Sequence, residues 1–160
     1  MLRAMLRFLI VLTAFLVLPI WAQDDGLPAD PGKAVTVRNC TGCHGAEMFA
    51  GSHKSQSDWD STISTMVDKG LSLPDAEYTT VLQYLSTCLG NPPKKLNINK
   101  APSCQISDAL GFSVDAANAI VAARTDKDGK PTPFADLDAL KKVAGVDAAA
   151  IDAKKDSISF

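Results

Sequence analysis

Apolar residues recur at helical spacing after the first third of the chain. One helical face is predicted by apolar residues at i, i+4, i+7 and i+8: Trp59, Ile63, Met66 and Val67. Asp58 is the expected N-cap of this helix, and Gly70 is expected to end it. Before it, residues 32–38 form a short apolar stretch that predicts a helix running into Cys40, and residues 42–57 read as loop.

A second helix is expected after Gly70. Ser72 is the expected cap, Pro74 suits the first turn, and Gly90 stops the pattern. The apolar positions of this helix are Val81, Leu82, Tyr84, Leu85 and Cys88.

The segment 91–95, Asn-Pro-Pro-Lys-Lys, interrupts the helical pattern and is the expected linker between two domains. Beyond it the chain is rich in Ala and Asp. Short helical patterns follow over residues 103–110, 114–124, 134–143 and 147–154. No segment reads as a sheet, and residues 158–160 suit an extended tail. The predicted fold class is therefore all-α in both halves.

The N-terminus has the pattern of a secretory signal. Arg3 and Arg7 precede an apolar run over residues 8–18, and Ala22 offers a cleavage site. The alternative, an uncleaved membrane anchor, would need about 20 apolar residues. We therefore expect residues 1–22 to be a signal peptide, residues 23–31 to be a flexible leader, and the protein to be periplasmic or secreted, with no transmembrane segment in the mature chain.

Composition narrows the possible functions. The chain has 160 residues, of which 46% are hydrophobic and 21% charged, which is typical of a globular protein. Its formal net charge of −2 gives no general reason to expect a nucleic-acid partner. Four cysteines are too few for a disulfide-dense scaffold, so their spacing is read individually.

Residues 40–44, Cys-Thr-Gly-Cys-His, match the attachment motif of c-type haem. Two thiols at this spacing add to the two haem vinyl groups, and the histidine that follows can bind the iron through a ring nitrogen. A thioredoxin-type redox pair would need a preceding strand, which the pattern does not offer. A zinc site would need further ligands, and only His53 and two distant cysteines remain.

The second axial ligand has three candidates: Met48, His53 and Met66. A methionine thioether is a soft ligand that stabilises reduced iron and suits electron transfer. Met48 and His53 lie close to His44 in sequence, where a short connection has difficulty reaching over the ring. Met66 lies 22 residues after His44 and is the preferred candidate; the alternative is a core methionine on an amphipathic helix.

Residues 40–89 resemble a small class I-like monohaem cytochrome c domain, similar to those found beside quinoprotein dehydrogenases. The resemblance implies a cytochrome domain over residues 32–90, with one covalent haem c held by four residues: Cys40, Cys43, His44 and Met66. His44 would be the proximal ligand and Met66 the distal one. The loop 51–57 departs from the family, because it lacks the Arg expected near a haem propionate. The possible substitutes are Lys54, Ser52 and Trp59.

Residues 96–101, Leu-Asn-Ile-Asn-Lys-Ala, open the second half, and two turn motifs follow at Gly111-Phe112-Ser113 and Gly145-Val146-Asp147. With these motifs, residues 96–160 resemble the paired helix-hairpin-helix domain of competence-type DNA-uptake receptors and of a photosystem extrinsic subunit. In nucleic-acid-binding members, a glycine-hydrophobic-glycine turn presents backbone N–H groups to a phosphate. Here Ser113 and Asp147 replace the second glycine. Residues 96–160 also carry 8 Lys+Arg against 9 Asp, which weakens DNA binding and favours docking to a protein.

Cys88 and Cys104 flank the linker and are expected to pair as a disulfide in an exported protein. The alternative is two buried free thiols.

These features together predict an exported one-electron carrier without catalytic residues, whose C-terminal half docks to a redox protein such as a dehydrogenase or a terminal reductase. Two alternatives remain: a DNA-binding uptake-type protein that carries a haem, and a haem peroxidase-like enzyme.

Overall fold

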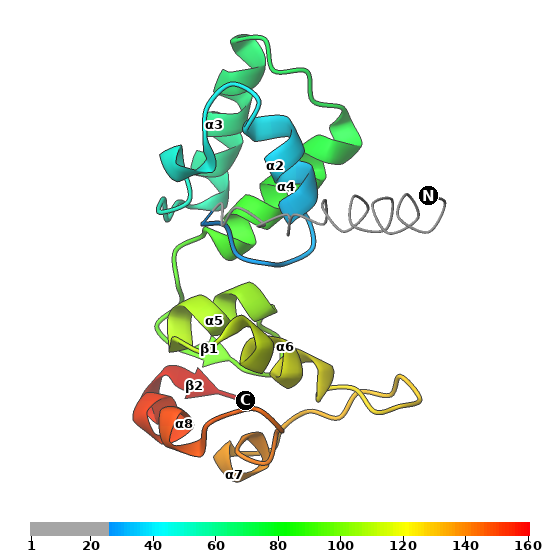
Figure 1. Ribbon diagram of the computed structural model, residues 1–160, viewed down its shortest axis with the longest axis vertical. Helices are drawn as coiled ribbons and strands as arrows, with labels where there is room; N and C mark the ends of the chain where they lie inside the picture. The colour runs from blue at the N-terminus through cyan, green and yellow to red at the C-terminus, as the bar shows by residue number, and fades with distance from the viewer. Residues whose placement is uncertain (1–25) are drawn as a thin grey trace, which may run out of the picture.

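The computed structural model describes residues 26–160, which fold into two helical units stacked end to end (Figure 1). The structure is mostly helical, which is compatible with the predicted all-α class. Residues 1–22, expected to be a signal peptide, and residues 23–25 of the expected leader lie outside the described residues. The first unit contains α2 (Lys33–Cys40), the 3-10 turn η1 (Ala46–Met48), α3 (Gln56–Asp68) and α4 (Asp75–Cys88).

Helix α3 begins earlier than predicted. Ser55, not Asp58, is its N-cap: the Ser55 hydroxyl accepts from the Asp58 backbone N–H at 3.2 Å and donates to the Asp58 carboxylate at 2.6 Å. Ser55 thus caps the helix through its hydroxyl, and Asp58 contributes from the first turn instead of from the cap. The predicted stop is correct, because Gly70 follows the helix with φ +104°.

Helix α4 begins later than predicted, because its N-cap position is two residues after Ser72, the expected cap. Pro74 occupies the N-cap position, and Asp75 and Glu77 lie in the first turn, where they face the positive end of the helix dipole. The helix ends at Cys88, as the pattern indicated.

The core of the first unit forms where α3 and α4 pack together. Trp59 and Ile63 are buried on α3, while Val81, Tyr84 and Leu85 are buried on α4. The predicted apolar face of α3 is therefore narrower than expected: Met66 is half-buried and Val67 is 41% exposed.

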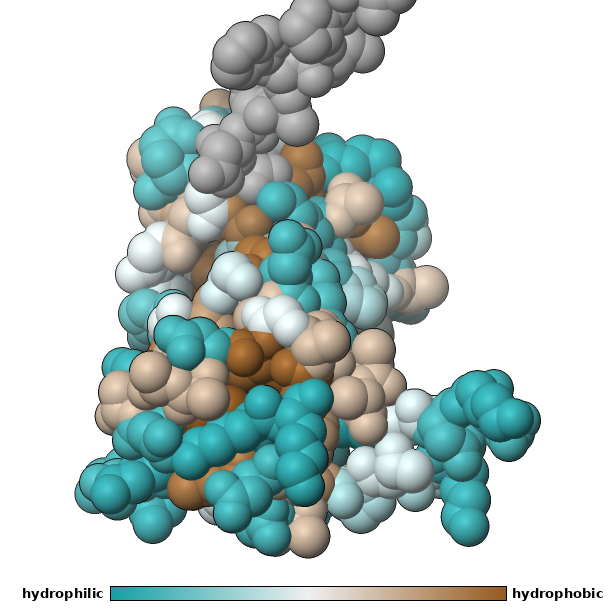
Figure 2. All heavy atoms as spheres, turned by 60° about the horizontal axis from the view of Figure 1, so that its bottom comes forward, coloured by the Kyte–Doolittle hydropathy of each residue, from teal (hydrophilic) through white to brown (hydrophobic). Residues whose placement is uncertain are grey.

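The second unit contains α5 (Ser103–Leu110), α6 (Val114–Ala122), α7 (Leu137–Leu140) and α8 (Ala148–Lys154). Two helical hairpins result, each with a left-handed glycine at the turn: Gly111 with φ +69° and Gly145 with φ +83°. In each hairpin the second helix is capped by the residue two positions after that glycine, Ser113 or Asp147. Figure 2 shows that hydrophilic side chains surround a small apolar area on the visible face of this unit.

The absence of any sheet was a wrong prediction. β1 (Leu96–Asn97) and β2 (Ile158–Ser159) form a short parallel pair with Leu96 opposite Ile158. The Ile98 N–H also donates to the Ser159 carbonyl at 2.8 Å. The C-terminal tail thus closes the unit by returning to its first residues, a long-range contact that local patterns do not reveal.

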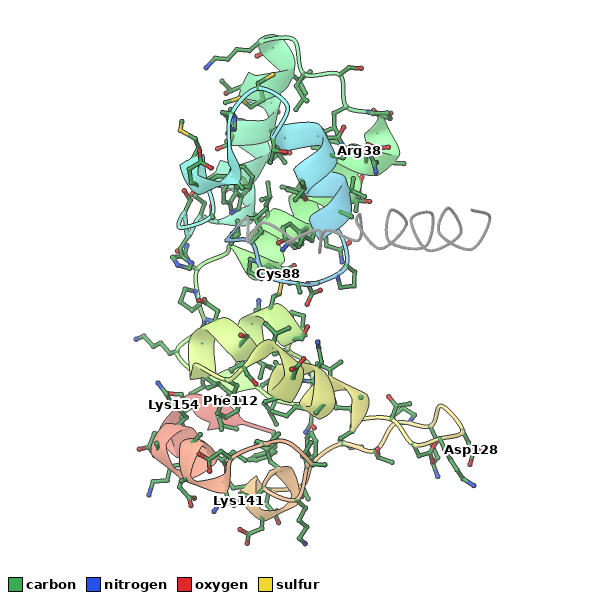
Figure 3. The ribbon with its side chains drawn as sticks, viewed as in Figure 1. Arg38, Cys88, Phe112, Asp128, Lys141 and Lys154 are labelled. Atoms are coloured by element: carbon green, nitrogen blue, oxygen red, sulfur yellow. A yellow bond between two sulfur atoms is a disulfide. The ribbon has the colours of Figure 1, made fainter. Side chains whose placement is uncertain are left out.

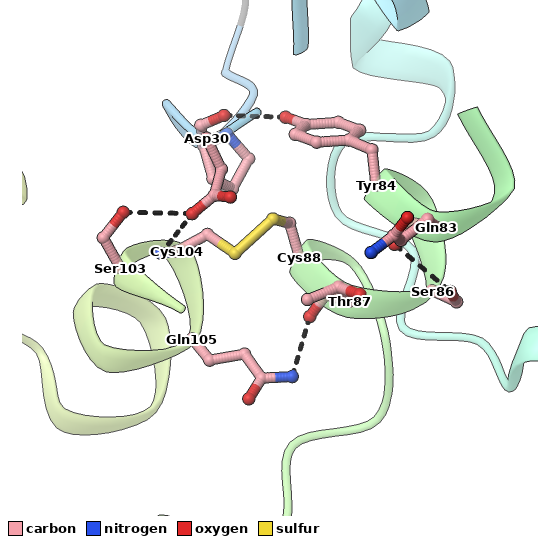
Figure 4. Close-up of a disulfide and its surroundings, with 10 residues drawn as sticks. Asp30, Gln83, Tyr84, Ser86, Thr87, Cys88, Ser103, Cys104 and Gln105 are labelled. Carbon is pink, nitrogen blue, oxygen red and sulfur yellow. Dashed lines mark hydrogen bonds between the residues drawn. A yellow bond between two sulfur atoms is a disulfide. The ribbon is translucent and has the colours of Figure 1, made fainter. Parts of the chain in front are cut away.

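The two units are joined by the disulfide between Cys88, at the end of α4, and Cys104, in the first turn of α5 (Figure 4). Their Cα atoms lie 5.4 Å apart, within the range that a disulfide requires. Beside it, the Gln105 side-chain amide donates to the Thr87 carbonyl at 3.0 Å. Among the described residues, no helix has the length and hydrophobicity needed to cross a bilayer.

Residues 26–31 belong to the segment expected to be flexible, but they pack across this junction. Leu27 is buried in the first core, and the Tyr84 hydroxyl donates to the Pro28 carbonyl at 2.7 Å. The Asp30 carboxylate accepts from the Ser103 hydroxyl at 3.0 Å and from the Cys104 backbone N–H at 3.2 Å (Figure 4). Asp30 therefore caps the start of α5, where Pro102 has no side chain that could do so.

We expect the double variant C88S/C104S to unfold at a lower denaturant concentration. A disulfide that spans 16 residues stabilises the fold by about 3 kcal/mol in the chain-entropy model, mainly by restricting the unfolded chain. Urea unfolding followed by circular dichroism measures this difference. Equal unfolding midpoints for the double variant and the parent would show that the bridge does not stabilise the fold.

Candidate functional site

The Cys-x-x-Cys-His motif lies where α2 ends. Cys40 is the last residue of α2, half-buried, and packs against the core of the first unit. Thr41 closes the helix, since both its backbone N–H and its hydroxyl donate to the Val37 carbonyl. The backbone then leaves the helix, so that Gly42 and Cys43 are exposed.

The end of α2 is fixed by a polar contact that the sequence analysis missed. The Asn39 side chain donates to the Val35 carbonyl at 2.9 Å and to the Glu77 carboxylate at 2.7 Å, and Arg38 pairs with Glu77 at 3.0 Å. The hydrogen bond from Asn39, together with Arg38, lowers the pKa of Glu77. Asn39 and Glu77 lie 38 positions apart, so no local sequence signal predicts their contact. This contact ties Asn39, the residue before Cys40, to helix α4.

His44 has one ring nitrogen engaged and one available. Its Nδ1 lies 3.4 Å from the Gly45 carbonyl oxygen, and its ring meets Phe49 edge-on, with centroids 6.2 Å apart. Nε2 has no hydrogen-bond partner among residues 26–160. With the hydrogen on Nδ1 directed at the carbonyl, the Nε2 lone pair is free to bind a metal, the usual arrangement of a ligating histidine.

One side of the motif is open. A Cβ placed on Gly42 would have no neighbour within 4 Å, and Cys43 is exposed. Met48, on the turn that follows, is 70% exposed. A planar group attached at residues 40–44 therefore meets no steric obstacle at Gly42.

The chain's four cysteines fall into two chemically distinct pairs. Cys88 and Cys104 are joined, while Cys40 and Cys43 are free thiols. Burial raises the pKa of the Cys40 thiol. The Asp30 carboxylate and the two disulfide sulfurs lie within 4.8 Å of one another, but bonded sulfurs do not act as thiolate ligands.

The three candidates for the second axial ligand occupy different places. Met66 lies in the last turn of α3, and is half-buried without being one of the side chains packed into the core. Met48 lies on η1, near the motif and largely exposed. His53 lies just before α3, at the opposite end of that helix from Met66, with Nδ1 3.2 Å from the Gly90 carbonyl oxygen. Approach of Met66 to His44 stays a prediction.

The motif loop and the helix of Met66 share one core. Ala46 is buried together with Trp59 and Ile63, and Cys40 and Phe49 pack against the same cluster. Met66 follows Ile63 by about one helical turn. The fold therefore packs the Cys-x-x-Cys-His segment and α3 against the same apolar cluster.

Of the residues considered for the propionates, Trp59 has another role. It is buried, and its indole N–H donates to the Leu89 carbonyl at 3.0 Å. The Lys54 ammonium lies 4.9 Å from the centroid of the Trp59 ring and donates to the Thr62 hydroxyl at 3.0 Å. Trp59 thus anchors α3 to the junction, and a propionate contact by Lys54 or Ser52 stays a prediction.

The donor set fits a c-type haem. Two free thiols at the required spacing, a histidine with Nε2 available and an open side are present together at residues 40–44. Two hollows at the junction, of about 250 Å³ and about 10 Å³, are lined by other residues. The candidate site is therefore identified from its donor atoms and its open side, and neither of these hollows belongs to it.

Comparison with protein-family models, with curated proteins and with solved structures finds no match to this chain.

In haem-free protein, exported by a host that lacks the attachment machinery, we expect iodoacetamide to label Cys43 faster than Cys40 at mildly alkaline pH. Only the thiolate reacts, and the raised pKa and burial of Cys40 reduce both its thiolate fraction and its access. Fragmentation mass spectrometry of the labelled peptide separates the two sites. Labelling of Cys40 at the rate of Cys43 would contradict the placement of Cys40 against the core.

Proposed function

We propose that the chain is an exported c-type cytochrome, a one-electron carrier with one covalent haem c and no substrate of its own. The observation that carries the proposal is the pairing of the four cysteines. The bridge between Cys88 and Cys104 leaves free only the two thiols of the motif, beside a histidine whose Nε2 is available.

Each residue of the motif has a defined part in this proposal. Cys40 and Cys43 would hold the macrocycle through two thioether bonds, and a ring nitrogen of His44 would bind the iron. A c-type haem supplies an iron that alternates between the ferrous and ferric states. The Gly45 carbonyl and the Phe49 ring orient the imidazole of His44.

Met66 completes the proposed site from α3. Its thioether is soft and would favour ferrous iron, which raises the reduction potential. Because Met66 is half-buried outside the core cluster, its side chain can serve as a ligand without removing a packing contact from that cluster.

The C-terminal unit serves in this proposal as a module for docking to a redox protein, in the periplasm or outside the cell. Its hairpin turns do not favour the DNA-binding alternative. The Ser113 hydroxyl accepts from the Ala116 N–H at 3.2 Å, and the Asp147 carboxylate accepts from the Ala149 N–H at 2.9 Å. Both helix N-termini are thus capped from within, and Asp147 places a negative charge where a phosphate would bind.

A redox titration of the purified, exported protein tests the function. We expect the haem absorbance to change in a single reversible one-electron transition, and we expect the haem to stay bound to the protein during acid-acetone extraction. The variant C40A/C43A should lose both, while C88S/C104S, which changes the same number of cysteines, should keep the haem. A colourless parent protein, or haem that is extracted by acid-acetone, would refute the proposal.

The variant M66A should lose the weak absorption band of methionine–iron coordination in the oxidised protein and should bind carbon monoxide in the reduced form. The matched control M48A removes an exposed methionine and should leave both properties as in the parent. Loss of the band in M48A, or its retention in M66A, would show that Met66 is not the ligand.

A further inference from the structure

Four lysines gather at one end of the two-stranded sheet. Lys94 and Lys95 lead directly into β1, while Lys154 and Lys155 lie just before β2. Because β1 and β2 pair in parallel, the segments that enter them approach the same end of the sheet, with strands about 4.8 Å apart. Figure 3 labels Lys154 on the side of the second unit where the linker descends.

All four side chains are exposed, and none forms an ion pair with an acidic group of residues 26–160. Lys141 differs, since it pairs with Asp152 on α8 and with Asp138 on α7. Three acidic residues lie close to these lysines in the chain or in the fold, and one of them, Asp152 on α8, is already paired with Lys141. Asp156 follows Lys155, and Asp108 lines the small hollow beside the linker prolines. The patch keeps a positive surplus.

The surrounding charge is of the opposite sign. Residues 26–90 carry four basic and seven acidic residues, whereas residues 91–160 carry ten basic and nine acidic ones. The positive surplus of the second unit is therefore small and concentrated at the linker end of the sheet. A local positive patch of this kind steers and orients a negatively charged protein surface.

We propose that Lys94, Lys95, Lys154 and Lys155 form the docking surface for an acidic protein. That this protein is the redox partner rests on the proposed function. Duplex DNA suits the surface less well. A duplex extends its charge along its whole length and would also meet Asp108 and Asp156 beside the patch, and the capped hairpins offer no free helix N-terminus to a phosphate.

Binding of the mature, haem-loaded protein to a short polyglutamate peptide at low ionic strength tests the proposal. The variant K94E/K154E should bind at least about tenfold more weakly than the parent. The matched control K127E/K130E makes the same charge change on the exposed arm whose residue Asp128 is labelled in Figure 3, and should bind like the parent.

Absence of binding by the parent, or an equal loss in both variants, would overturn the proposal. Duplex DNA and vesicles of anionic phospholipid are measured in parallel, and tighter patch-dependent binding to either would replace the acidic protein as the partner. The haem absorbance of each sample distinguishes a failure of the docking surface from a failure of the proposed electron-carrier function. A haem-free protein that still binds polyglutamate through these lysines would keep the docking surface while refuting electron transfer.

Discussion

The covalent bond between Cys88 and Cys104 is the constraint on which the arrangement of this molecule depends. It fixes the end of α4 to the first turn of α5, and Asp30 caps that same turn from the leader. Leu89, the residue after Cys88, accepts hydrogen bonds through its carbonyl from the Trp59 indole N–H and the Lys54 backbone N–H. The start of α3, the end of α4 and the start of the C-terminal unit therefore meet at this one bridge.

The bridge also decides the chemistry of the remaining cysteines. With Cys88 and Cys104 joined, Cys40 and Cys43 are the free thiols, at the spacing that two haem vinyl groups require. Their environments differ, because Cys40 packs against the core whereas Cys43 faces solvent. The core thus holds one end of the motif while the other end stays accessible.

The sequence predicted those parts of the fold that local signals control. α5 has its predicted bounds because Pro102 and the left-handed Gly111 mark its two ends. The start of α3 was misplaced because both Ser55 and Asp58 are residue types that cap helices, and the start of α4 was misplaced because that helix begins after Pro74 without any side-chain cap. The strand pair, the Asp30 cap and the contact between Asn39 and Glu77 join residues 38 or more positions apart, so no local pattern could announce them. At the site, the motif residues were evident from spacing alone, but the free Nε2 of His44 is visible only in the structure.

The most direct measurement is the mass of one tryptic peptide. Cleavage after Arg38 and Lys54 releases residues 39–54, which contain both motif cysteines and His44. The account predicts that, in protein exported by a host that attaches haem, this peptide carries the mass of one haem, and that the peptides with Cys88 and Cys104 are linked to each other without haem. Recovery of residues 39–54 without haem, as two free thiols or as an internal disulfide, would contradict it.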